Sequence, residues 1–154
     1  MSTNTIDPKV RKLAKDLTRD FPRSPREKLA GYVLAARALD KCRAELSGTH
    51  GEYHYACPLD SQFLEFSGIS ADDFRNAVAE GRSDDEMDRW IREHAKNESK
   101  DDVIRWNNSL RDKRISEMDT ELQVFLEDYI DEFIPKDRVV YHWFDVYDIE
   151  EKRI

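Results

Sequence analysis

Helix-capping signals recur along the middle of this sequence, and they constrain the fold more strongly than any other feature. Serine occupies four candidate N-cap positions that acidic residues follow within three positions: Ser24, Ser70, Ser83 and Ser99. Proline at a helix start, or glycine or proline after a helix end, marks further boundaries at Pro58, Gly48, Gly68, Gly81 and Pro135. The spacing predicts helices over 25–47, 58–67, 70–80 and 117–134, with two more beginning at 83 and 99.

The predicted fold is therefore mainly α, a single-domain bundle of five or six helices over 1–154. A chain of 154 residues has the length of one ordinary domain. The tail, 138–154, contains "RVVYHWFDVY", which is rich in β-branched and aromatic residues. We expect this tail to be extended and to pair with "EYHY" at 52–55 in a small two-stranded β element, or to pair across a homodimer.

Charge and hydropathy exclude several classes of partner. The net charge of −8 disfavours nucleic acid, because most of the surface would repel phosphates. No apolar run approaches the roughly 18 residues that span a bilayer, and the N-terminus has no apolar signal-peptide core. We expect a cytoplasmic protein that does not enter membranes and whose two cysteines, Cys42 and Cys57, are free thiols.

The charge is distributed unevenly along the chain. Residues 1–43 contain 11 basic and 5 acidic residues, a net of +6, whereas the remaining residues have a net charge of −14. We expect the basic N-terminal segment to fold back on the acidic part. The alternative is that Arg19, Arg23 and Arg26 bind an external anion.

One face of the predicted helix over 25–47 carries an unexpected charge. A helical wheel places its apolar side chains on one arc and Arg37, Lys41 and Glu45 on the opposite side. Arg43 lies within the apolar arc, and Asp40 lies at its margin. A buried charge needs a partner, so Arg43 either pairs with a carboxylate such as Asp40 or lines a cavity that holds an anionic group.

The segment "GEYHYACPLD", 51–60, follows that helix and concentrates chemically active side chains. Its Cys57 precedes Pro58 at a predicted helix N-terminus, where the dipole favours a thiolate, and His54 could serve as its base. Alternatively His54 could perform acid–base chemistry with Tyr53 or Tyr55 and no covalent step.

Two other interpretations of this segment remain open. His50, His54 and Cys57, with Asp60 as a fourth ligand, have a spacing that could hold zinc, but zinc sites usually show two close pairs, so no metal is predicted. The tyrosines could instead pack on the long helix while His54 satisfies loop backbone groups, which would make the segment structural.

Several motifs resemble a family of small bacterial proteins catalogued as a domain of unknown function. They are "FPRSP", "GYVLAARALDK", "GTHGEYHYACPLD" and "FLEFSGI", all within 20–69, with weaker similarity in "AEGRSDDEMDRWIREH" and "HWFDVYDIEE". The resemblance implies a bacterial cytoplasmic origin and no assigned activity. It suggests a core over 20–95, a helical extension over 96–137 and the tail over 138–154.

Two classes of function follow. In the first, the protein is a binding protein or enzyme for a small anionic molecule, with a pocket at 48–60. Its catalytic residues would be Cys57 and His54, and its ligand would contact Arg43, Asp40, Tyr53, Tyr55 and Glu52. In the second, it is a non-catalytic interaction or regulatory protein in which the same segment is structural. The sequence names no reaction and no cofactor.

Overall fold

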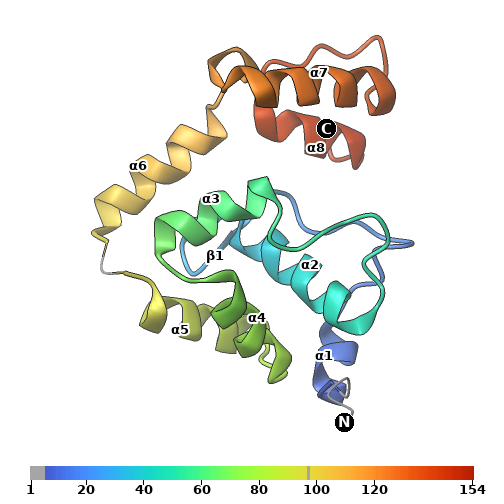
Figure 1. Cartoon of the computed structure of the whole chain (residues 1–154). Helices are drawn as coiled ribbons and strands as arrows, with labels where there is room; N and C mark the ends of the chain where they lie inside the picture. The colour runs from blue at the N-terminus through green and yellow to red at the C-terminus, as the bar shows by residue number, and fades with distance from the viewer. Residues whose placement is uncertain (1–5, 97) are drawn as a thin grey trace. The chain divides into compact units, whose positions relative to one another are not determined.

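A computed structural model describes residues 6–96 and 98–154, which form two compact units, Met1–Ser99 and Lys100–Ile154 (Figure 1). Both units are mainly helical, as predicted, and the described residues contain eight α-helices rather than five or six. None of these helices combines the length and apolar character needed to cross a membrane. The assignment of 1–154 to a single domain stays a prediction.

The unit Met1–Ser99 is built around one buried helix. Its elements are α1 (Pro8–Leu13), β1 (Lys28–Leu29), β2 (Tyr32–Val33), α2 (Ala35–Ser47), α3 (Pro58–Ser67), α4 (Ala71–Ala79) and α5 (Asp84–His94). Helix α2 contacts α1, α3, α4 and β1, and every residue of Ala35–Ala44 is buried. A helix that is buried on all sides has no solvated face, so its charged side chains must find partners inside the protein.

The helix predicted over 25–47 begins ten residues later than expected, at Ala35. In its place β1 and β2 form an antiparallel hairpin in which Leu29 pairs with Tyr32. The two residues between them, Ala30 and Gly31, have φ of 54° and 88°, as a type I′ turn requires. The prediction was wrong because it relied on the capping signal at Ser24. Gly31 argued against a helix here, since glycine is unfavourable in a helix interior.

Four of the other predicted caps are confirmed. Gly48 and Gly68 end α2 and α3 in the left-handed conformation. The Ser70 side chain accepts a hydrogen bond from the backbone of Asp73 at the start of α4. Ser83 opens α5 with a complete capping box. Local side-chain chemistry therefore decides where these helices begin and end.

The unit Lys100–Ile154 consists of α6 (Lys100–Arg111), a short 3-10 helix (Ile115–Glu117), α7 (Thr120–Phe133) and α8 (Trp143–Glu150). The tail over 138–154 is extended only before α8, where His142 forms an isolated antiparallel bridge with Arg114. Its larger part is α8, a helix whose buried residues include Trp143, Val146 and Ile149. The two-stranded sheet of this protein is β1–β2, and "EYHY" is not part of it. A short run of apolar residues suits a buried helix as well as a strand, which explains the error.

Two glycines with positive φ differ in their surroundings and provide a test of the packing of α1. A Cβ on Gly81 would lie 2.9 Å from Lys9 Cβ of α1, whereas a Cβ on Gly48 would meet nothing within 4 Å. Gly48→Ala should cost about 1–2 kcal/mol, for backbone strain alone. Gly81→Ala should cost about 2–4 kcal/mol, because strain and overpacking add. Urea unfolding of both variants checks this, and equal losses would contradict it.

Candidate functional site

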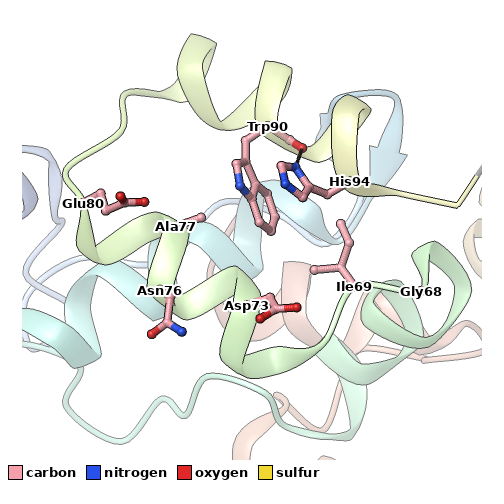
Figure 2. Close-up of a pocket in the computed structure, with 8 residues that line it drawn as sticks. All are labelled: Gly68, Ile69, Asp73, Asn76, Ala77, Glu80, Trp90 and His94. Atoms are coloured by element: carbon pink, nitrogen blue, oxygen red, sulfur yellow. Dashed lines mark hydrogen bonds between the residues drawn. The ribbon is translucent and has the colours of Figure 1, made fainter.

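The structure contains a pocket of about 370 Å³ between α4 and α5 (Figure 2). Its lining includes Asp73 and Asn76 of α4 and Trp90 and His94 of α5. None of the seven site residues predicted from the sequence lines this pocket. The predicted segment at 48–60 lies outside this pocket.

Cys57 is the N-cap residue of α3, with Pro58 at the first helical position, as predicted. The residue is partly exposed, whereas the other free cysteine, Cys42, is buried in α2. Ala56, directly before it, has a φ of 63°, which is costly for a residue with a side chain. The thiol thus stands at a helix N-terminus, directly after a strained residue.

Lys41 of α2 connects Cys57 to a buried carboxylate. Its Nζ donates a hydrogen bond to Cys57 Sγ at 3.1 Å and lies 3.0 Å from Asp60 Oδ2. The side chains of Lys41 and Asp60 are 4% and 0% exposed. Asp60 Oδ2 also accepts a hydrogen bond from the backbone of Ala56 at 2.9 Å. We call Lys41, Cys57 and Asp60 the thiol cluster.

One oxygen of the thiol cluster is unused. Asp60 Oδ1 is buried and has no hydrogen-bond partner among the described residues. Burial raises the pKa of Asp60 above its ordinary value, against the opposing charge and hydrogen bond of Lys41. Asp60 is therefore suited to hold a proton, and Oδ1 is available to carry it or to bind a ligand donor.

The sequence interpretation missed Lys41, which it placed on the exposed side of the helix. The error has a physical cause: the wheel assumes one solvated face, but α2 is covered on all sides. Alanines at 35, 36, 38 and 44 are distributed around the helix, and these small side chains allow neighbouring elements to approach from every direction. That distribution was the signal that could have revealed a central helix.

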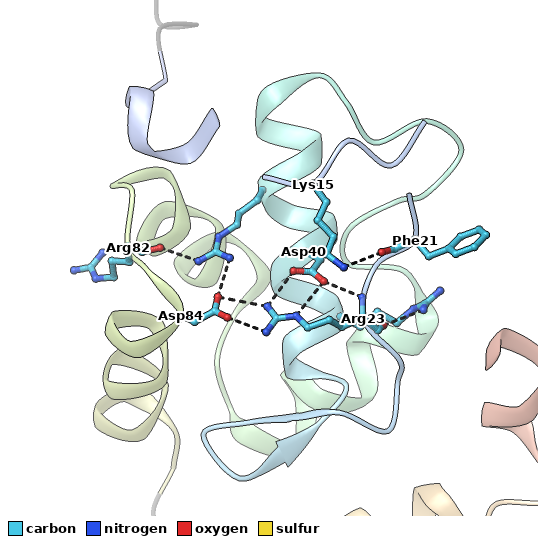
Figure 3. A network of polar contacts seen from close by, with 8 residues as sticks. Lys15, Phe21, Arg23, Asp40, Arg82 and Asp84 are labelled. Carbon is cyan, nitrogen blue, oxygen red and sulfur yellow. Dashed lines mark hydrogen bonds and ion pairs between the residues drawn. The ribbon is translucent and has the colours of Figure 1, made fainter. Parts of the chain in front are cut away.

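Arg43 pairs with a carboxylate, which was one of the two alternatives predicted, but this carboxylate is distant in sequence. Its guanidinium contacts Asp84 at 2.8 Å and the backbone oxygen of Arg82 at 3.0 Å (Figure 3). Asp40 accepts three hydrogen bonds from Arg23, through the backbone N, Nε and Nη2. Arg23 also pairs with Asp84 at 2.9 Å, so the basic N-terminal segment does fold back on the acidic part. We call these four charged side chains the arginine–aspartate network.

The network also sets the titration of Asp84. Burial raises the pKa of Asp84, but the charge of Arg23 and the hydrogen bonds from Arg43 and Arg23 outweigh it, so the pKa lies below 3.8. The stability that this carboxylate contributes is present above pH 3.8 and is lost as the pH falls through the lower pKa of the folded protein. These contacts account for the charges of Arg43 and Asp40 without an external ligand.

The remaining predicted residues do not converge on one point. Tyr55 is buried, and its hydroxyl donates a hydrogen bond to the backbone oxygen of Ala71 at 2.9 Å. The Tyr53 ring lies 5.7 Å from the Arg37 guanidinium. His54 and Glu52 are exposed. Burial raises the pKa of Tyr55, which removes it further from proton transfer near neutral pH.

His54, the base predicted for Cys57, makes no hydrogen bond to the thiol among the described residues. The His54 ring contacts His50, with ring centroids 6.2 Å apart, and within 6–96 and 98–154 it makes no hydrogen bond. In the same ranges, no three or more His, Cys, Asp or Glu side chains gather closely enough to hold a metal ion. The described neighbour of the thiol is therefore Lys41, and a role for His54 stays a prediction.

Comparison with known proteins assigns the chain to a family. A family model described as a domain of unknown function, DUF5069, matches residues 19–153. The chain belongs to this family. No curated protein matches the chain significantly. The DUF5069 match spans the predicted 20–95 core, the 96–137 extension and nearly all of the tail, and its description assigns no activity.

Proposed function

We propose that this DUF5069 protein is an enzyme or binding protein that uses Cys57 as a nucleophile toward a small electrophilic molecule. The contact of 3.1 Å between Lys41 Nζ and Cys57 Sγ carries the proposal. An ammonium group and a helix N-terminus both stabilise a thiolate, which is the reactive form of cysteine. Cys57 is partly exposed, which suits attack on a small molecule from solvent, whereas Lys41 and Asp60 are shielded from water.

The charges of the thiol cluster support a simple proton balance. When Asp60 is ionised, it balances Lys41 and the thiol stays neutral. When the thiol proton passes to Asp60, the thiolate balances Lys41 instead, so the buried charge is unchanged. Burial raises the pKa of Asp60, which makes this carboxylate a better proton acceptor than an ordinary one.

A carbonyl compound illustrates the reaction. The thiolate electron pair forms a bond from sulfur to the carbonyl carbon, and the π pair moves to the carbonyl oxygen. That oxygen takes a proton from Lys41, and Asp60 returns its proton to Lys41, so atoms and charges balance without a further reactant. An ammonium next to a developing oxyanion stabilises it.

Alkylation of the native protein tests this proposal. Iodoacetamide should modify Cys57 rapidly: sulfur bonds to carbon, and iodide leaves with the electron pair of the broken bond. Cys42 should stay unmodified, because it is buried and burial raises its pKa to about 12. Lys41→Met should slow the modification of Cys57 about tenfold or more, since hydrogen bonds to charged groups contribute about 1.5–3 kcal/mol. Intact mass and peptide mapping give both rates.

Three further variants make this result interpretable. Cys57→Ser should take up no label in the folded state. The double variant Lys41→Met/Asp60→Leu removes the ammonium without leaving an unpaired buried charge, and continued protection of Cys42 shows that it is folded. His54→Gln should react like the unchanged protein. An unaltered rate in the folded double variant would refute the role of Lys41, and a tenfold loss in His54→Gln would identify the histidine as the base.

The second candidate function, an interaction protein, is supported by a separate observation in Lys100–Ile154. Val124 and Phe125 of α7 are 59% and 58% exposed, and Val139 and Tyr141, between α7 and α8, are 67% and 56% exposed. Large exposed apolar side chains often mark contact surfaces. If this surface forms a homodimer, Phe125→Ser should lower the mass measured by analytical ultracentrifugation to that of a monomer, and Cys57→Ser should not.

A further inference from the structure

The pocket between α4 and α5 has the size of a small-molecule site. Its volume of about 370 Å³ lies within the range of roughly 300–1,000 Å³ that is usual for ligand pockets. Ile69 and Ala77 are buried at its floor, and the polar side chains around them are exposed. The pocket thus combines an apolar base with a polar rim.

Two aromatic rings of α5 form one wall of the pocket. The His94 ring stacks on the Trp90 ring, with centroids 4.2 Å apart and planes at 18° (Figure 2). The Trp90 ring is supported in turn by the edge contact of buried Phe74 at 6.3 Å. The His94 side chain is exposed. These contacts hold both rings in place without a ligand.

The hydrogen bond of His94 determines which ring nitrogen remains available. Nδ1 lies 2.8 Å from the backbone oxygen of Trp90, which can only accept, so Nδ1 carries the hydrogen. In the neutral ring Nε2 is then an acceptor. The backbone contact thus fixes the hydrogen on Nδ1 and leaves the lone pair of His94 Nε2 available.

The α4 side of the pocket contributes unused acceptors and negative charge. The carboxylate of Asp73 and the side-chain amide of Asn76 have no partner among the described residues. Glu80 pairs with Arg82 at 2.5 Å. The lining contains no lysine or arginine. A nearby cation, Lys96, lies against Gly68 through its aliphatic stem and has its Nζ 3.8 Å from Glu98.

We infer that this pocket binds a small organic cation that carries a primary ammonium group. Such a group offers N–H donors and a positive charge, and the lining supplies the Asp73 carboxylate and the acceptor His94 Nε2. The aromatic wall attracts a cation through its ring electrons, and the apolar floor suits a short alkyl chain. Excess negative charge in the lining disfavours an anion of the same shape.

A titration of the full chain with n-butylammonium tests the inference, with butyrate as the anion of equal chain length. NMR signals of the Trp90 indole N–H, identified through Trp90→Phe, and of the His94 ring should shift saturably with butylammonium only. Asp73→Asn should weaken the binding about tenfold or more. Asp72→Asn removes the same charge from the same first turn of α4, but Asp72 does not line the pocket, so its affinity should be unchanged.

Several outcomes would overturn the inference. Absence of a saturable shift, equal binding of butyrate, or equal weakening by the two aspartate variants would each show that the pocket does not select a cation through Asp73. Cys57→Ser should bind butylammonium like the unchanged protein. The inference can therefore fail or succeed independently of the proposed chemistry at Cys57.

Discussion

Lys41→Met is expected to lower the free energy of unfolding of the unit Met1–Ser99 by about 3–5 kcal/mol. The reason is the burial of its partner: Asp60 is fully buried and would lose the cation at 3.0 Å that offsets its charge. Asp60→Leu should cost a similar amount, because it leaves Lys41 buried without a counter-charge. Urea unfolding followed through the NMR signal of the Trp90 indole N–H reports this unit by itself.

The double variant Lys41→Met/Asp60→Leu provides the control for that prediction. Replacing both members of a buried ion pair by apolar residues is often neutral or stabilising, so the double variant should recover most of the loss. Additive losses from the two single variants would contradict the pairing. A stable double variant with an unreactive Cys57 would show that the pair serves the thiol more than the fold.

The difference in stability between the unchanged protein and the double variant Lys41→Met/Asp60→Leu should depend on pH with a definite sign. Burial raises the pKa of Asp60 above its ordinary value of 3.8. The stability that this group contributes is therefore present below pH 3.8 and is lost as the pH rises through the higher pKa of the folded protein. The advantage of the unchanged protein over the double variant should therefore shrink as the pH rises through this window. Asp84 and Glu45, whose pKa values are lowered, are present in both proteins and cancel in the difference.

Phe74→Ala should have an effect of similar size, about 3–5 kcal/mol. Phe74 is fully buried, and its ring contacts those of Tyr55, Phe63 and Trp90 at 5.8, 5.9 and 6.3 Å. Alanine would leave a cavity among these rings and remove the support behind Trp90. The same urea experiment measures the loss.

Phe21→Ala is the matched control for Phe74→Ala. Phe21 belongs to the same unit, but its side chain is 37% exposed, so its removal should change the stability by no more than about 0.5 kcal/mol. Phe74→Leu keeps most of the apolar volume and should cost less than Phe74→Ala. Similar losses for Phe21→Ala and Phe74→Ala would contradict the central position of Phe74.

Where the sequence predicted structure well, the interactions responsible are local. Ser83 and Glu86 form their capping box within a single turn, and Gly68 ends α3 through its own backbone conformation. Such signals need no distant partner, which is why the caps of α3, α4 and α5 were predictable. The hairpin at 28–33 and helix α8 were missed because capping or composition signals there are compatible with more than one conformation.

The candidate site likewise combines a local feature that the sequence predicts with distant contacts that it does not. Its location near Cys57 was predictable, because the residue before a helix-initiating proline is the N-cap. The partner of Cys57 was not, because Lys41 is 16 positions away and its burial depends on elements that surround α2. The position of Arg43 in the apolar arc showed that it needs a partner. The partner itself could not be identified from the helix, because Asp84 is 41 positions away.

The sequence by itself therefore determined a mainly helical chain, the boundaries of most helices and the position of Cys57 at a helix N-terminus. These depend on capping, backbone conformation and periodicity over a few residues. Only the tertiary structure decided that α2 is buried on all sides, that Lys41 faces Cys57 and Asp60, and that Trp90 and His94 form a pocket with Asp73. Burial and long-range pairing depend on which surfaces meet, and helical periodicity does not specify that.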